Sequence, residues 1–180
     1  MRKVVVSEFV ALDGVIENPM WTMPYWSEEI AAFKQAELFG VDDLLLGRVT
    51  YEGFAQAWPG RTDEQGYGDR MNGMPKHVVS STLQAAEWNN TTIIRGNLAE
   101  EVGRLKEQPG QDILVFGSGV LVNGLLARGL VDRFTLLIYP LALGSGQRLF
   151  ADGSAAKLTL VESKAFGSGV VACVYEVAKE

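Results

Sequence analysis

Apolar and polar residues succeed one another along this chain in blocks that predict alternating strands and helices. Residues 2–10 form a β-branched and aromatic run with few polar interruptions, which is typical of a central strand buried on both faces. Further strands are predicted at residues 42–47, 76–81, 91–95, 112–116 and 132–139. Two last strand patterns, 157–163 and 170–177, are joined by a turn that contains glycine, and they predict an antiparallel hairpin.

Helical patterns follow the first, second, fourth and fifth of these strands. The first helix is expected to begin after the N-cap Ser27 and to end at Gly40. The others are predicted at residues 48–57, directly after the cap residue Asn97, and at 120–128. We therefore predict one α/β domain over residues 1–180, with a mostly parallel central sheet of about eight strands, four helices on its two faces and a C-terminal antiparallel hairpin. Residues 60–76 are glycine-rich and without period, which predicts a long loop of the kind that forms lids or interaction segments.

Composition and charge narrow the classes of function. With 180 residues, 47% of them hydrophobic and 21% charged, the chain is expected to be globular with a well-formed core. The net charge of −6 argues against general nucleic-acid binding. A single cysteine (Cys173) and a single histidine (His77) argue against a disulfide framework and against a metal site. Without a targeting segment or an apolar run of roughly 20 residues, the protein is expected in the cytoplasm and away from the membrane.

Two turns from strand to helix carry the candidate chemistry. The first contains Gly47, Arg48 and Thr50. A helix N-terminus offers unpaired N–H groups and partial positive charge to a phosphate, which the arginine and the hydroxyl can also bind. The alternative is an ordinary turn with a solvated arginine. The second turn, residues 117–119 (GSG), lets the backbone approach a pyrophosphate, although its spacing and its place in the chain differ from the Rossmann fingerprint.

An aromatic segment that includes Trp21 and Trp26 precedes the first helix, whose first turn holds Glu28 and Glu29. Glutamates at this position are commonly only partners of the helix dipole. Beside aromatic residues, a carboxylate can instead be half-buried and bind a polar heterocycle. The apolar residues of the preceding turn-rich segment 11–19 face either a ligand or partner, or lie buried under a neighbouring loop.

Five short motifs stand in a fixed order at the predicted strand ends. They are LDGVI at 12–16, LGRVTYE at 46–52, VSST at 79–82, FGSG at 116–119 and YPLALG at 139–144, followed by Phe150. In these motifs the chain resembles the dihydrofolate reductase-like superfamily, most closely the RibD C-terminal-domain group, which is the reductase half of the riboflavin-pathway deaminase-reductase. The resemblance spans residues 2–178. It implies a dihydrofolate reductase-like three-layer αβα fold and NADPH-dependent hydride transfer to a pyrimidine or pteridine-like heterocycle, as in 5-amino-6-(5-phosphoribosylamino)uracil reductase.

The resemblance also implies cofactor-binding roles for residues at these strand ends. Gly47, Arg48 and Thr50 would bind the cofactor phosphates, and Ser80, Ser81 and Arg95 would surround the 2′-phosphate of the adenosine. Gly117, Ser118, Gly119 and Val120 would cradle the pyrophosphate, while Asp13, Gly14, Val15 and Ile16 would line the nicotinamide. The residues themselves agree with NADPH, because arginine and hydroxyl groups gathered on an acidic protein suit it better than NAD.

On the substrate side, the carboxylate that holds the pterin in dihydrofolate reductases would correspond to Glu29, counted back from Phe33. Glu28 competes for this role, because the preceding segment is two residues longer than in those enzymes. Such a group would orient the ring and assist its protonation. The candidate substrate-binding residues are Trp21, Trp26, Phe33 and Arg148, the last of them for a substrate phosphate.

Two other functions stay open at this point. One is a true dihydrofolate reductase, and the other is a non-catalytic NADPH-binding dimeric protein. The expected ligand in either enzymatic case is a small heterocycle, with no nucleic-acid or membrane partner. The terminal hairpin and the leucine-rich sixth strand favour a homodimer that buries a sheet edge, while a covered edge in a monomer is the alternative.

Overall fold

The computed structural model describes residues 1–178 of the chain, with eight strands and six helices in that range. The strands are β1 (Val4–Ala11), β2 (Val41–Gly47), β3 (Lys76–Val79), β4 (Thr91–Ile94), β5 (Asp112–Phe116), β6 (Arg133–Tyr139), β7 (Leu158–Ala165) and β8 (Val171–Val177). The helices are the 3-10 helix η1 (Pro19–Tyr25) and the α-helices α1 (Glu28–Phe39), α2 (Arg48–Ala57), α3 (Tyr67–Gly73), α4 (Leu98–Glu107) and α5 (Gly119–Leu126).

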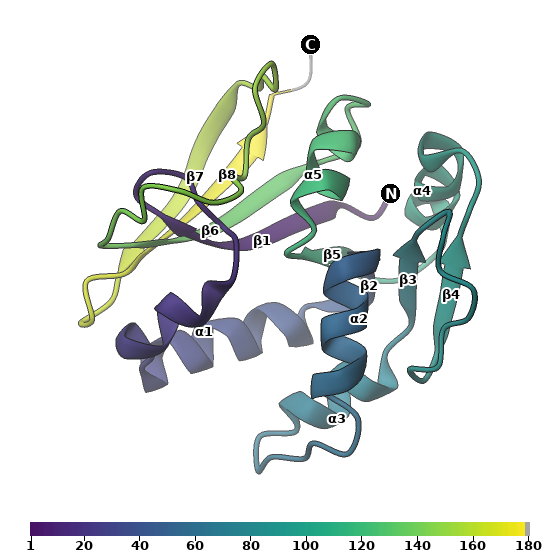
Figure 1. The fold of residues 1–180 in the computed structure, drawn as a ribbon, viewed down its shortest axis with the longest axis horizontal. Helices are drawn as coiled ribbons and strands as arrows, with labels where there is room; N and C mark the ends of the chain where they lie inside the picture. The colour runs from purple at the N-terminus through teal and green to yellow at the C-terminus, as the bar shows by residue number, and fades with distance from the viewer. Residues whose placement is uncertain (179–180) are drawn as a thin grey trace.

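All eight strands form one sheet in the order β4-β3-β2-β5-β1-β6-β8-β7 (Figure 1). The first six strands along the chain run parallel to one another, so their carboxyl ends meet at one edge of the sheet. β8 runs antiparallel to β6, and β7 antiparallel to β8. The predicted fold class is confirmed, including the mostly parallel sheet of about eight strands and the C-terminal hairpin.

The predicted number of helices was wrong, because α3 and η1 were not expected. Helix α3 lies inside the segment predicted as a loop, where its glycines hide the helical pattern. It is held by tertiary contacts instead. The Asp63 carboxylate accepts hydrogen bonds from the N–H groups of Tyr67 (2.9 Å) and Gly68 (2.6 Å), and the side chain of Met71 is fully buried.

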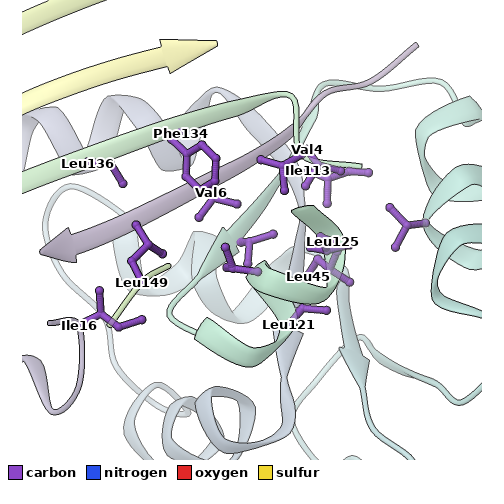
Figure 2. Close-up of a cluster of buried hydrophobic side chains, with 14 of the residues drawn as sticks. Val4, Val6, Ile16, Leu45, Ile113, Leu121, Leu125, Phe134, Leu136 and Leu149 are labelled. Carbon is purple, nitrogen blue, oxygen red and sulfur yellow. The ribbon is translucent and has the colours of Figure 1, made fainter. Parts of the chain in front are cut away.

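The central strands of the sheet are buried on both faces, as their apolar patterns predict, whereas the edge strand β7 is largely exposed. Alternate residues of the central strands point to opposite sides. One set packs against α4 and α5 (Figure 2), and it includes Val4, Val6, Leu45, Ile113 and Val115. The other set packs against α1, α2 and α3, and it includes Val5, Leu44, Leu46, Leu114 and Phe116. Among residues 1–178, the helices are too short or too polar to cross a membrane.

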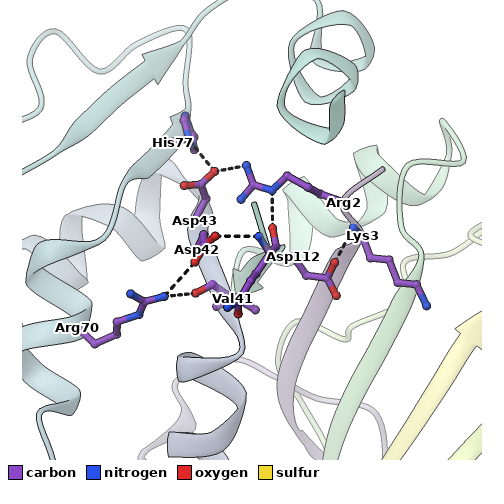
Figure 3. Close-up of polar contacts among 9 residues, drawn as sticks. Arg2, Lys3, Val41, Asp42, Asp43, Arg70, His77 and Asp112 are labelled. Carbon is purple, nitrogen blue, oxygen red and sulfur yellow. Dashed lines mark hydrogen bonds and ion pairs between the residues drawn. The ribbon is translucent and has the colours of Figure 1, made fainter. Parts of the chain in front are cut away.

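Charged side chains fasten the amino ends of the strands to one another (Figure 3). Arg2 pairs with the buried Asp43 at 2.6 Å, and Nε2 of His77 lies 3.7 Å from the same carboxylate. Burial opposes the ionisation of Asp43, but hydrogen bonds from His77 and Arg2 bring its pKa below the ordinary value. The neighbouring Asp42 accepts a hydrogen bond from the N–H of Gln111 at 2.8 Å. The acidic pair at the start of β2 therefore has a structural role in joining these segments.

Lys76, at the start of β3, is a fully buried cation that connects three segments. Its ammonium donates to the backbone carbonyls of Asn72 (3.0 Å), Met74 (2.8 Å) and Asn89 (2.9 Å), and it lies 4.3 Å from the ring centre of Trp88. Burial lowers its pKa to about 8, so the ammonium form prevails at neutral pH.

We expect Lys76→Met to lower the free energy of unfolding by about 2–4 kcal/mol, because three buried carbonyl groups lose their donor. Chemical denaturation at pH 7 measures this change. The matched control is Lys157→Met, since Lys157 is exposed, and its effect is expected to stay within about 0.5 kcal/mol. Equal effects of the two substitutions would contradict the structural role of Lys76.

Candidate functional site

The two glycine-containing turns singled out in the sequence meet in space. β2 and β5 are parallel neighbours, so the turns that follow them lie side by side at the carboxyl edge of the sheet. The Ser118 hydroxyl accepts a hydrogen bond from the Gly47 N–H (2.8 Å) and lies 3.0 Å from Oγ1 of Thr50, to which it can donate. A Cβ atom at Gly117, where φ is +52°, would stand only 2.9 Å from Oγ1 of Thr50. Glycine is therefore required for this close approach.

Both turns open helices whose first N–H groups have no side-chain cap. The N-cap residues are Gly47 for α2, which has no side chain, and Ser118 for α5, whose hydroxyl accepts no capping hydrogen bond. Two helix N-termini thus bring unpaired donors and partial positive charge to one place. Such a place suits a pyrophosphate, whose two negative groups need adjacent donors.

A cavity of about 1130 Å³ runs along this edge. Of the residues predicted to bind the cofactor, Ile16, Thr50, Gly117, Ser118 and Gly119 line it. The lining also comes from β1, α1, α3, the loop before α3 and Gln147. The site is therefore built from segments that lie far apart in the sequence.

The predicted phosphate ligand Arg48 lies outside the lining residues. Its guanidinium pairs with Glu52 at 2.9 Å on the surface of α2, and both side chains are 43% exposed. Val120, also predicted at the cofactor, is 80% exposed at the start of α5. At the two turns, the cavity is therefore lined by Thr50 and residues 117–119, and not by the Arg48 side chain.

The other residues of the LDGVI motif do not line the cavity, but they fix the conformation of the loop at residues 12–16. The Asp13 carboxylate accepts hydrogen bonds from the N–H groups of Leu143 (3.0 Å) and Gly144 (2.7 Å), and the bond from Gly144 is the main cause of its lowered pKa. Nε of Arg148 donates to the carbonyl of Asp13 at 3.0 Å, and Val15 forms a bridge with Arg148. Gly14 adopts a positive φ of 86° within this turn.

This loop reaches the second glycine turn at Gly119. A Cβ atom on Gly119 would stand 2.9 Å from Nε2 of Gln147 and 3.0 Å from Cδ1 of Ile16. Gly119 therefore keeps the wall of the cavity open at the point where the loop, the turn and Gln147 converge.

The residues predicted to bind the adenosine phosphate lie farther along the same edge, at the ends of β3 and β4. The Ser80 hydroxyl accepts hydrogen bonds from the N–H groups of Thr82 (3.2 Å) and Leu83 (3.0 Å), which forms a tight turn. The Arg95 guanidinium donates to the carbonyl of Leu83 in the same turn. Ser81 and Arg95 are exposed, while Ser80 is buried.

The first turn of α1 separates the two candidate carboxylates. Glu28 lines the cavity, whereas Glu29 turns toward the β7–β8 connection, where its carboxylate accepts a hydrogen bond from the Gly167 N–H at 3.1 Å. Among the predicted aromatic residues, Trp26 lines the cavity. Trp21 packs edge-on against Tyr139, and Phe33 against Phe166. These two rings support the wall instead of forming it.

Sequence reasoning missed four charged residues of the lining, Glu8, Glu17, Lys34 and Asp63, and of these Glu8 and Lys34 are buried. Glu8, on β1, is only 5% exposed, and its Oε1 has no hydrogen-bond partner among the residues described. Burial raises its pKa to about 8, although the nearby Lys34 opposes this shift and Glu37 adds to it. A lone carboxyl in the otherwise apolar run VVVSEFVA was the signal that could have found it.

Lys34, on α1, interacts electrostatically with this carboxyl. Its ammonium donates to the Ser7 hydroxyl at 2.6 Å and pairs with the carboxylate of Glu37. It also lies 4.5 Å from the ring centre of Phe116. Lys34 is buried, so its charge acts in surroundings that screen it less than water does.

The chain is similar to known proteins over most of its length. The family model described as the RibD C-terminal domain matches residues 2–172. The protein YyaP of Bacillus subtilis strain 168 is 32% identical over 178 residues, covering 97% of this chain and 94% of its own. YwjB of the same organism is 29% identical over 178 residues, covering 94% and 95%. Both relatives are described as uncharacterized proteins.

Solved structures support the fold. A protein named for riboflavin biosynthesis from Shewanella sp. PV-4 superposes with a TM-score of 0.72 at 18% identity, covering 98% of this chain and 99% of its own. A pyrimidine reductase-like protein of Corynebacterium diphtheriae gives 0.69 at 13% identity, with 99% and 93% covered. The dihydrofolate reductase of Enterococcus faecalis, solved with NADP(H), gives 0.62 at 15% identity, with 98% and 97% covered. The chain therefore has the dihydrofolate reductase-like fold.

The burial of Glu8 predicts a pH dependence of stability. Its pKa is raised in the folded chain, from an ordinary 4.5 to about 8, so between these values the native state binds more protons than the unfolded state. The free energy of unfolding should therefore fall as the pH rises from 5 to 8, by on the order of 3–5 kcal/mol from this group.

Chemical denaturation of wild type and Glu8→Gln across this pH range isolates the contribution. The wild-type curve should fall relative to the variant, because the carboxamide does not titrate. Glu162→Gln, which changes an exposed glutamate of β7, should run parallel to wild type. A Glu8→Gln curve that also runs parallel to wild type would mean that Glu8 titrates normally.

Proposed function

Since this chain belongs to the RibD C-terminal domain family, we propose that it is an NADPH-dependent reductase that acts on a pyrimidine or pteridine-like heterocycle. The observation that carries the proposal is the hydrogen bond from the Gly47 N–H to the Ser118 hydroxyl, which joins two uncapped helix N-termini at one end of the cavity. A phosphorylated dinucleotide fits this arrangement, because its pyrophosphate needs several donors and a close backbone approach.

The residues of the two turns would hold the cofactor. Gly117 and Gly119 admit the pyrophosphate, while the Thr50 hydroxyl and the N–H groups at the start of α5 bind its oxygens. Ile16 and the loop fixed by Asp13 would place the nicotinamide against the cavity wall. When bound, NADPH supplies the hydride, and the protein contributes the orientation of the ring and the surroundings of the reacting atoms.

The choice of NADPH over NADH would depend on Ser80, Ser81 and Arg95. They lie beyond the two turns on the same edge of the sheet, at the ends of the next two strands. Arg95 is exposed and oriented through its bond to the Leu83 carbonyl, so its remaining N–H groups are available for a 2′-phosphate.

The acceptor would occupy the part of the cavity next to α1. Trp26, Phe54, Trp58 and Phe116 give the cavity aromatic walls, which suit a flat ring. Glu8, Glu28 and Lys34 add polar groups that can bind ring nitrogens and carbonyl oxygens. This combination of aromatic walls and polar groups supports a heterocyclic acceptor.

We expect saturable binding of NADPH, tighter than that of NADH, in a titration that follows quenching of tryptophan fluorescence. Arg95→Ala should weaken NADPH binding about 10- to 100-fold by removing a charge-assisted bond to the 2′-phosphate, and should leave NADH binding nearly unchanged. Arg104→Ala is the matched control, because Arg104 is exposed and pairs with Glu100 and Glu101 on α4. The reductase proposal fails if the wild-type protein does not bind NADPH.

Oxidation of NADPH in the presence of an acceptor tests the reaction itself. The acceptors to compare are 5-amino-6-(5-phosphoribosylamino)uracil and 7,8-dihydrofolate. Faster turnover of the uracil derivative would support the riboflavin-type reductase, and faster turnover of dihydrofolate would assign the protein to dihydrofolate reductases. NADPH binding without reduction of either compound, or of 7,8-dihydropterin, would favour a non-catalytic binding protein.

A homodimer is part of the proposal, supported by the exposed apolar side chains of Leu160 and Val161 on the edge strand β7. Light scattering should give twice the chain mass of 19.6 kDa. Leu160→Glu should shift the mass toward that of one chain, because a charge would be buried in the contact. A single-chain mass for the wild type would rule the dimer out.

A further inference from the structure

Glu8 lies where the sheet divides. β1 pairs with β5 only as far as Ser7, which lies opposite Phe116. It then continues to Ala11 along β6 alone. Glu8 is therefore the first residue of β1 beyond its last partner on β5. At this point β5 has turned away into the 117–119 turn, which would hold the cofactor.

The cavity passes through this division. Successive side chains of a strand point to opposite faces of a sheet, yet Ser7, Glu8 and Phe9 all line the same cavity. The opening beside β1 thus connects the turns of β2 and β5 with the space next to α1. The Glu8 carboxyl stands at the junction of the two parts, where cofactor and acceptor would meet.

The carboxyl has no structural use that accounts for its burial. It is 5% exposed, and its Oε1 lacks a hydrogen-bond partner among residues 1–178. A buried polar atom without a partner destabilises a folded chain, unless a ligand completes its hydrogen bonds. Lys34 has its direct partners in Ser7 and Glu37, so its charge influences Glu8 only electrostatically.

We propose that the Glu8 carboxyl binds the nitrogen heterocycle and donates the proton that completes its reduction. This inference rests on the proposed reductase function and names the acceptor chemistry: a ring with a reducible C=N bond whose nitrogen faces a carboxylic acid. The acid would come from β1, whereas the resemblance to dihydrofolate reductases implies a carboxylate in the first turn of α1.

The reaction balances with groups already named. Reduction of a C=N bond adds a hydride to carbon and a proton to nitrogen, and the hydride with its electron pair comes from NADPH. The O–H bond of Glu8 breaks as the new N–H bond forms, and Glu8 is left as a carboxylate. The Lys34 ammonium stabilises this carboxylate, and a proton from solvent restores the acid.

The protonation state required is consistent with the surroundings of Glu8. Burial raises the pKa of Glu8 to about 8, so most of it is protonated at neutral pH. Lys34 opposes this shift and Glu37 adds to it. The other charged groups around the same cavity are Glu17, Glu28 and Asp63.

Measurements of binding and of hydride transfer distinguish the two proposed roles of Glu8, which are to bind the heterocycle and to donate a proton to it. Binding of 7,8-dihydropterin is measured in the presence of saturating NADP⁺ from pH 6.5 to 9, and hydride transfer from NADPH to 7,8-dihydropterin in a single turnover. Glu8→Gln keeps one donor and one acceptor but has no proton to give. We expect its affinity at pH 6.5 to stay within about threefold of wild type, while its transfer rate falls about 100-fold or more.

The wild-type affinity should fall about tenfold or more by pH 9, because the carboxylate loses its donor, and the affinity of Glu8→Gln should not. Glu162→Gln should match wild type throughout. Transfer by Glu8→Gln within threefold of wild type, or an identical pH dependence of binding, would overturn the inference. Loss of transfer in Glu29→Gln with none in Glu8→Gln would assign the acid to α1 and overturn it as well.

The same titrations distinguish this inference from the proposed function. If the wild-type protein does not bind NADPH, both the proposed function and this inference are wrong. A wild-type protein that binds NADPH but not 7,8-dihydropterin keeps the cofactor assignment and overturns the acceptor chemistry inferred here.

Discussion

The pairing of β2 with β5 is the constraint on which the rest of the site depends. Their parallel register brings two turns, more than sixty residues apart in the chain, to adjacent positions on one edge. The Ser118 hydroxyl then ties them together through the Gly47 N–H. Any side chain at Gly117 would collide with Thr50. The donors that the proposed cofactor would meet here therefore come mainly from backbone that is already fixed, which would keep the entropic cost of binding low.

The same pairing explains where the cavity opens. β5 ends at Phe116 and enters its glycine turn, while β1 continues along β6 to Ala11. Within the described part of the chain, strand β1 thus has no partner on its β5 side near the carboxyl edge of the sheet. This edge is the usual place for a ligand in an open α/β sheet. Ionic contacts such as Arg2 with Asp43 close the amino edge instead. The two edges therefore differ, with ionic contacts at the amino edge and the cavity at the carboxyl edge. This difference follows from the direction of the strands and from the fact that β5 ends before β1.

Much of this arrangement could be predicted from the sequence, because the strands and the glycine turns are local patterns. Helix α2 begins and ends where the sequence indicates, and so does β5. Helix α3 could not be predicted, because it depends on Asp63 and on the burial of Met71, which are tertiary contacts. The surroundings of Arg48 could not be predicted for a similar reason: the sequence shows that a guanidinium is present, but not that Glu52, one helical turn later, pairs with it. Helical phase likewise decides that Glu28 faces the cavity and Glu29 the β7–β8 turn.

Glu8 shows how a misfit within a well-predicted element can indicate function. On β1 it occupies the same side of the strand as Val4, Val6 and Val10, all of which belong to the apolar core. An apolar residue there would continue that pattern, whereas the carboxyl must lose water and, among residues 1–178, its Oε1 gains no partner. Folding alone gives no reason for a glutamate at this position. A residue that breaks the local rule at the opening of a cavity, under the electrostatic influence of Lys34, is best explained by a ligand that completes its hydrogen bonds.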